Sequence, residues 1–159
     1  MPASDFEGSA YAAELDLSLD DRWSLTLSQQ YDPNDDQTDL SAVRAQYRFA
    51  TRGVANLAYR YRRDVLEQVD ASAAYPLSDR TRLVARWLYS LQDHDTLEAF
   101  AGVEYESCCW ALRVLGRHYV RNIEGDSNNA LYLELELKGL GAIGRKSEDF
   151  LRRAIYGYR

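Results

Sequence analysis

The chain has 159 residues, a length that suits a single domain, and its formal net charge at pH 7 is −6. This acidic balance does not fit a nucleic-acid-binding protein, which needs a positively charged face. The 12 tyrosines, together with 3 tryptophans, 4 phenylalanines and only 3 prolines, favour β structure.

Membrane helices are not expected. The chain has no run of the roughly 18 to 20 consecutive apolar residues that a membrane helix needs. Its first residues, MPASDFEGSA, have neither the basic start nor the apolar stretch of a signal peptide. A leader upstream of this segment is left open, because the segment can begin in mid-protein.

Apolar and polar residues alternate along most of the chain. In the run 11–19, Tyr11, Leu15 and Leu17 share one face, and Glu14 and Asp16 share the other. A period of two is that of a β-strand, and nine such runs follow one another. They are 11–19, 23–31, 41–50, 54–63, 69–75, 82–91, 97–106, 110–115 and 131–138.

The connections between these runs alternate in length. Four are tight (19–22, 50–53, 76–80 and 106–109), whereas 32–39 and 122–129 are long and polar. Short turns at one end of a meander and longer loops at the other are typical of an outer-membrane barrel. A soluble antiparallel barrel or sandwich gives the same alternation with its faces exchanged.

Strand length and aromatic placement favour the membrane barrel. Most of the runs have about 9 to 12 residues, which suits a tilted membrane strand better than a globular one. Aromatic residues lie near strand ends, where interfacial girdles form. These are Trp23, Tyr31, Phe49, Tyr61, Tyr75, Tyr89, Tyr105 and Trp110. We therefore predict an all-β, antiparallel up-and-down meander of about nine long strands, part of a transmembrane β-barrel. Because such barrels have even strand numbers, further strands are expected upstream.

The last residues depart from this pattern. Ser147 is a suitable helix N-cap, acidic residues follow it, and Phe150, Leu151 and Ile155 fall on one face. A short amphipathic helix is predicted, with a basic terminus of no particular role as the alternative. The chain is accordingly divided into an N-terminal flank (1–8), barrel strands (9–139) and a tail (140–159).

The only two cysteines, Cys108 and Cys109, are adjacent. Adjacent side chains of an extended strand point to opposite faces, so no bond between them is expected. If each is oxidised, its partner lies outside this chain; buried structural thiols and a metal site are the alternatives. A metal site would need a Cys-x-x-Cys spacing and more ligands than His94 and His118, so no metal or cofactor is expected. Neither histidine has a supporting nucleophile, so catalysis is not expected either.

A basic face opposes the apolar stripe and should line the barrel lumen. It carries Arg44, Arg48, Arg60, Arg62, Arg82 and Arg86. Guanidinium groups bind phosphate and carboxylate groups well, which would suit an anionic ligand. The alternative is a hydrated wall in which these charges are balanced by Glu98, Glu104, Glu134 and Glu136.

Three stretches carry a family resemblance. EYESCCWALRV, then ALYLELELKGLG, then EDFLRRAIYGYR resemble the C-terminal end of the LptD family, the LPS-assembly proteins of Gram-negative outer membranes. Residues 97–159 carry the motifs, and 9–92 match as generic barrel strands. The resemblance implies the C-terminal part of a large barrel that inserts lipopolysaccharide (LPS) into the outer leaflet and holds the lipoprotein LptE as a plug. It implies a translocon component and not an enzyme.

The resemblance also implies roles for particular residues. Cys108 and Cys109 would form disulfides with two cysteines of an N-terminal periplasmic domain. The cysteine turn and the tail would be periplasmic, and the arginines of the lumen would contact the plug or LPS. The last strand would form one side of a lateral gate, with Leu131, Leu133, Leu135 and Leu137 on it. The implied partners are an LptE-like lipoprotein, the rest of the same protein, LPS and outer-membrane lipid. A porin-like barrel and a soluble β-sandwich binding module are the alternatives.

Overall fold

The protein is described here by a computed structural model that covers residues 11–33, 37–49, 53–120, 126–138, 141–144 and 147–158. These residues form ten strands and one helix. The strands are β1 (Tyr11–Ser18), β2 (Trp23–Asp32), β3 (Gln37–Phe49), β4 (Gly53–Arg62), β5 (Leu66–Pro76), β6 (Thr81–Ser90), β7 (Asp95–Glu106), β8 (Trp110–Val120), β9 (Ser127–Leu137) and β10 (Gly141–Gly144). The helix is α1 (Ser147–Ala154).

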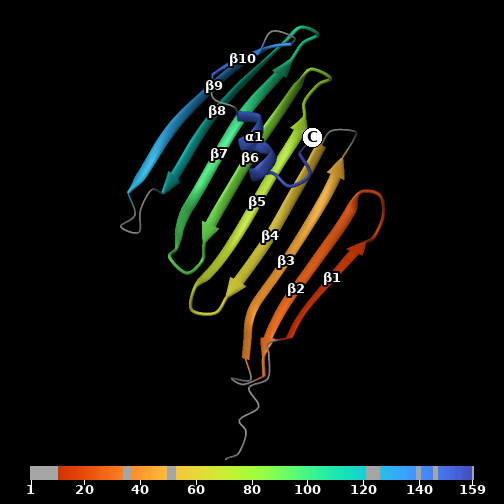
Figure 1. The fold of residues 1–159 in the computed structure, drawn as a ribbon, viewed down its shortest axis with the longest axis vertical. Coiled ribbons are helices and arrows are strands. Elements are labelled where there is room, and N and C mark those ends of the chain that lie inside the picture. The colour runs from red at the N-terminus through yellow and green to blue at the C-terminus, as the bar shows by residue number, and fades with distance from the viewer. Residues whose placement is uncertain are drawn as a thin grey trace, which may run out of the picture.

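All ten strands belong to one sheet, and each pairs antiparallel with the next in chain order (Figure 1). The nine long strands have 8 to 13 residues. The predicted all-β meander of about nine long strands and the short terminal helix are both confirmed. Among the described residues, no helix has the length and apolarity that a membrane crossing would require.

A tenth strand lies where the sequence predicted only a tail. Gly141–Gly144 pairs with Leu137–Glu134 of β9. Glycines interrupt the alternation here, so the side-chain pattern gave no strand signal. Backbone pairing needs no side chains, and β10 occupies donors and acceptors that β9 would otherwise leave open at its edge. The run 131–138 is therefore not the last strand of this chain.

Several strands are longer than their apolar stripes. β8 continues to Val120 and β9 begins at Ser127, so the predicted loop 122–129 is partly strand. The ladder pairs Tyr119 with Asn128 and Val120 with Ser127. Polar residues extend the strands because a ladder is formed by backbone groups, which every residue here supplies.

The sheet has two chemically different faces. We call the face on which α1 packs the inner face and the opposite one the outer face. Large apolar side chains stand exposed on the outer face, as the alternation predicted. They include Leu15, Leu17, Trp23, Val43, Leu57, Tyr59, Leu83, Trp87, Val103, Trp110, Leu131, Leu133 and Leu137. Such a large uncovered apolar surface is foreign to soluble monomers.

The hydrophobic core lies on the inner face, beneath the C-terminal segment. Leu151 and Ile155 are fully buried and Tyr158 is 9% exposed. They pack on Val54, Ala74, Val84, Phe100 and Leu115, one residue from each of β4 to β8. Burying two such aliphatic side chains contributes about 3 to 6 kcal/mol. Figure 1 shows α1 lying across the middle strands of the sheet.

Candidate functional site: the inner face and the cysteine turn

A row of alternating charges crosses the inner face near the turns that join β5 to β6 and β7 to β8. Arg82, Glu104, Arg113 and Glu134 are successive partners across β6, β7, β8 and β9. Arg82 Nε lies 2.8 Å from Glu104 Oε2, and Arg113 Nε lies 3.2 Å from Glu104 Oε1. Arg113 also reaches Glu134 at 3.3 Å and Glu136 at 3.1 Å. The strand register brings these positive and negative side chains together, because partner residues in adjacent strands lie side by side on one face.

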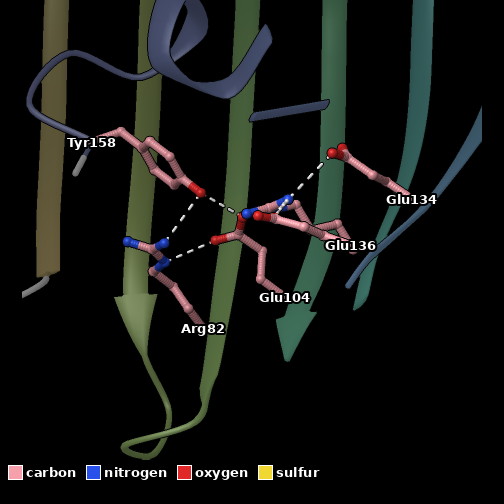
Figure 2. Close-up of polar contacts among 6 residues, drawn as sticks. Arg82, Glu104, Glu134, Glu136 and Tyr158 are labelled. Atoms are coloured by element: carbon pink, nitrogen blue, oxygen red, sulfur yellow. Dashed lines mark hydrogen bonds and ion pairs between the residues drawn. The ribbon is translucent and has the colours of Figure 1, made fainter. Parts of the chain in front are cut away.

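The C-terminal segment completes this charge row. The Tyr158 hydroxyl donates a short hydrogen bond to Glu104 Oε1, and the Arg82 guanidinium lies 4.3 Å from the centre of the Tyr158 ring. Figure 2 shows Tyr158 reaching from the tail to Arg82 and Glu104. Burial, and next the negative charge of Glu104, raise the pKa of Tyr158 well above its ordinary value. Its hydroxyl is therefore a hydrogen-bond donor across the neutral pH range.

A second set of ion pairs lies farther along the same strands. Arg86 Nη2 lies 2.7 Å from Asp70 Oδ2, and its Nη1 lies 3.4 Å from Glu98. Arg117 Nε lies 2.8 Å from Glu98 Oε1, and its guanidinium lies over Phe150 of α1 at 4.9 Å. Arg82 and Arg86 thus contact acidic residues, which is the balanced wall that the sequence left as an alternative.

The other predicted arginines are placed differently. Arg44 and Arg60 line a hollow of about 470 Å³ on the inner face, which α1 bounds with Arg152 and Arg153. The Arg44 guanidinium lies 5.0 Å from the Tyr156 ring centre. The hollow is also lined by Arg86, its fifth arginine, and by two acidic residues, Glu14 and Asp70. Arg48 and Arg62 are exposed on strands β3 and β4 outside this lining. We call this space the basic hollow.

The backbone of the tail is hydrogen-bonded to side chains of β3 and β4, beside the basic hollow. The Tyr156 carbonyl accepts hydrogen bonds from Gln46 Nε2 at 3.2 Å and from Asn56 Nδ2 at 2.9 Å. Gly157 follows with φ +82°, a conformation that favours glycine, and an added Cβ would meet Gln46 at 2.8 Å. The C-terminal segment therefore reaches from β9 to β3 across the inner face.

Helical spacing alone does not predict this docking of the tail. It places Leu151 and Ile155 on one helix face but does not identify the surface that this face covers. The available signal was a set of apolar residues at inner-face positions that are otherwise polar: Val54, Ala74, Val84, Phe100 and Leu115. When several neighbouring strands each carry one apolar residue on an otherwise polar face, the pattern indicates a patch that another segment covers.

The cysteine turn, residues 107–109, joins β7 to β8, and both thiols are exposed. Because the pair lies in a bend and not in a strand, the expected opposite orientation is wrong: the two Sγ atoms lie 2.9 Å apart. The contact between the two sulfurs, and next a hydrogen bond from the Ser107 hydroxyl, lower the pKa of Cys108, whereas the contact between the sulfurs raises the pKa of Cys109. Cys108 is thus the better nucleophile of the two.

The two histidines, His94 and His118, lie apart from the cysteine turn. His94 lies in the β6–β7 turn, and His118 Nδ1 lies 2.8 Å from Asn129 Oδ1 on β9. In the described parts of the chain, no group of three or more His, Cys, Asp and Glu side chains is placed to hold a metal ion.

The remaining predicted residues lie on β9. Leu131 and Leu133 are 77% and 61% exposed on the outer face, and Leu137 is 36% exposed. Leu135 on the same face is half-buried. β10 covers the edge of β9 only at 134–137, so within the described residues the edge at 127–133 has no strand beside it.

Comparison with known proteins identifies the family. The sequence model of LptD, described as LPS transport system D, matches residues 2–87, more than half of the chain. The chain belongs to the LptD family. The match covers the strands that sequence analysis could assign only as generic barrel strands, so the membership does not depend on the cysteine motif.

Curated relatives extend the similarity over nearly the whole chain. LPS-assembly protein LptD of Nitrosococcus oceani is 46% identical over 150 residues, which are 94% of this chain and 20% of that protein. The LptD proteins of Xanthomonas campestris pv. campestris and Xylella fastidiosa are 42% and 38% identical over 156 residues, with coverages of 94% of this chain and 19% and 20% of theirs. The chain thus spans about a fifth of the length of these LptD relatives.

Proposed function

We propose that this chain is part of an outer-membrane β-barrel that inserts LPS into the outer leaflet. The observation that carries this proposal is the contrast between the two faces of the meander in a member of the LptD family. Its outer face presents uncovered apolar side chains that suit lipid, and its inner face presents charged side chains that suit a hydrated lumen. The names of the curated relatives describe them as LPS-assembly proteins.

The basic hollow supports a contact with an anionic ligand or with an LptE-like plug lipoprotein. Five arginines line it against two acidic residues, and one of the five, Arg86, is paired with Asp70 and Glu98. Guanidinium groups bind phosphate and carboxylate groups through paired hydrogen bonds. The hollow lies on the inner face, where both the plug and the saccharide of LPS would lie in a barrel. Arg48 and Arg62 would contact the same lumen nearer its two ends.

Complementation tests the function. Cells depleted of the full-length protein would receive the double variant Arg44→Glu, Arg60→Glu or the control Arg80→Glu, whose position is an exposed turn. We expect LPS at the cell surface, measured by surface labelling, to fall with the double variant and to stay normal with the control. Normal surface LPS with both, at equal levels of folded protein, would contradict a role of the basic hollow.

Photo-crosslinking identifies what the basic hollow contacts. A photoreactive residue at position 60 should crosslink to the plug lipoprotein or to LPS, whereas one at position 80 should crosslink to neither. Crosslinks from position 60 that reach only other strands of the barrel would favour the balanced wall.

We propose that the open edge of β9 forms one side of a lateral gate. β10 pairs with four residues of β9, and among the described residues no strand lies beside the edge near Leu131 and Leu133, which would pair with the first strand of the complete barrel. Each backbone hydrogen bond contributes about 1 kcal/mol net, so a seam with few of them separates at low cost. Lipid could then leave sideways.

Disulfide crosslinks test the gate. A bond from position 131 to the first strand should stop LPS delivery until a reductant is added. The matched control joins Val114 and Leu133, which are direct partners in β8 and β9 and already stay together. Undiminished delivery with the first crosslink would refute a gate at this seam.

Cys108 and Cys109 are proposed to form two disulfides with cysteines outside this chain, in an N-terminal periplasmic domain. Both sulfurs are exposed at one end of the sheet, where another domain can reach them, and this end and the tail would face the periplasm, where disulfides persist. Serine at either position should change the mobility of the full-length protein in non-reducing electrophoresis. Unchanged mobility would count against these bonds.

A further inference from the structure

The two thiols of the cysteine turn are close enough to react with each other. Their Sγ atoms lie 2.9 Å apart, and a disulfide bond is about 2.05 Å long. Closing the bond therefore needs the two sulfurs to approach each other by about 1 Å. Neighbouring cysteines in a strand would have to bend the backbone to achieve this approach.

The turn is fixed on both sides. The Ser107 amide donates to the Trp110 carbonyl at 2.8 Å, and the Lys138 amide donates to the Cys109 carbonyl at 2.9 Å. The Lys138 ammonium lies 2.6 Å from Glu106, which places a positive charge next to the turn. The Ser107 hydroxyl lies 3.9 Å from Cys108 Sγ. These contacts hold the backbone while leaving both sulfurs in solvent.

We propose that Cys108 and Cys109 form a disulfide-exchange site that passes through a bond between the two adjacent cysteines. Adjacent Cα atoms are about 3.8 Å apart, which is shorter than the usual span of a disulfide of about 4.4 to 6.8 Å. The ring is therefore strained. Strained and exposed disulfides are the ones that exchange readily, so this bond is an intermediate and not a permanent crosslink.

The bond forms with an external disulfide as oxidant. The Cys108 thiolate attacks one sulfur of that disulfide, whose S–S bond breaks and releases one thiolate. Cys109 loses its proton to solvent and attacks Cys108 Sγ, and the second thiolate leaves. Two cysteine thiols are thereby oxidised, and one external disulfide is reduced to two thiols.

The exchange that follows rests on the proposed inter-domain disulfides. A thiolate from outside this chain attacks one sulfur of the adjacent pair, the strained bond breaks, and one inter-domain disulfide forms. The other cysteine is released as a thiolate and reacts with a second external disulfide, and then with the second incoming thiol. Adjacent placement thus lets one turn supply both bonds in sequence.

Peptide mass spectrometry tests the bond between adjacent cysteines. The full-length protein would be reduced, freed of reductant, treated briefly with 5,5′-dithiobis(2-nitrobenzoate), blocked with N-ethylmaleimide and digested with trypsin. Residues 87–113 form one tryptic peptide with both cysteines. We expect this peptide to be lighter by two hydrogen atoms and to carry no aryl adduct. A peptide with two aryl adducts would overturn the proposal.

Two controls separate this from the proposed function. In the single variants Cys108→Ser and Cys109→Ser, the peptide should keep one aryl adduct, because no second thiol displaces it. In urea, where the turn is not held, two adducts should predominate. A time course that shows crosslinks to cysteines outside this segment, and never the bonded adjacent pair, would overturn the exchange site while supporting the inter-domain disulfides.

Discussion

Glu104 is the residue on which the charge row depends. It is 6% exposed and contacts Arg82, Arg113 and Tyr158, whereas Glu136 contacts the same Arg113 with its side chain 34% exposed. Removing a buried partner leaves other charges uncompensated, and removing an exposed one leaves them hydrated. The two glutamates are therefore a matched pair for measuring what burial adds.

We expect Glu104→Ala to destabilise the folded protein by roughly 3 kcal/mol and Glu136→Ala by less than about 1 kcal/mol. The measurement is the temperature at which the full-length protein in detergent changes from its folded to its unfolded band in electrophoresis. Equal decreases in the unfolding temperature of the two variants would show that burial adds nothing to the contribution of the charge row.

Tyr158 gives a pH-dependent contribution with a definite sign. Its folded-state pKa is raised, so from about the ordinary value of 10.0 upward the unfolded chain loses this proton while the folded chain keeps it. The contribution of Tyr158 to the free energy of unfolding is constant below that pH and decreases above it. Between about pH 8 and about pH 11, Tyr158→Phe should lose less stability than the unchanged protein. Parallel losses in unfolding temperature would contradict the raised pKa.

At the scale of elements, the β7–β8 pair depends on close packing at one glycine. A Cβ at Gly102 would lie 2.3 Å from Leu115 Cδ2 and 2.5 Å from the Val114 carbonyl, whereas one at Gly116 has its nearest neighbour at 3.9 Å. Leu115 is held beneath the tail and cannot move aside without disturbing the inner core.

Gly102→Ala should therefore destabilise the protein by about 1 to 3 kcal/mol, and Gly116→Ala should change its stability little. Both variants carry the same added methyl group in the same strand pair, so propensity is matched. The folded fraction after refolding into detergent would measure the difference. A tolerated alanine at position 102 would mean that Leu115 repacks freely.

At the scale of the whole molecule, the tail connects distant strands. Ile155→Asp would place a charge in the fully buried position between α1 and the sheet, and the tail should leave the inner face. Trypsin should then cleave after Arg152 and Arg153 in the folded full-length protein. Tyr156→Ser, which changes a side chain that is 59% exposed, should leave these sites protected. Mass spectrometry of the released fragments distinguishes the two, and equal cleavage would argue against docking.

Sequence predicted the meander well because its signal is local. Alternation along each strand fixes which side chains share a face, and the outer face was assigned correctly from Leu57 to Leu133. Three features depend on contacts that alternation does not encode. β10 is built from backbone pairing, the thiols approach because they lie in a bend, and the tail docks on residues up to 110 positions away.

The docked tail also affects the order of events in folding. A meander whose strands contact only their sequence neighbours has short loops to close and can form hairpin by hairpin. The bonds from the Tyr156 carbonyl to Gln46 and Asn56 close loops of 110 and 100 residues, and the same tail packs on β4 to β8. Docking of the tail is thus a non-local step that can follow only the pairing of the strands on which the tail packs.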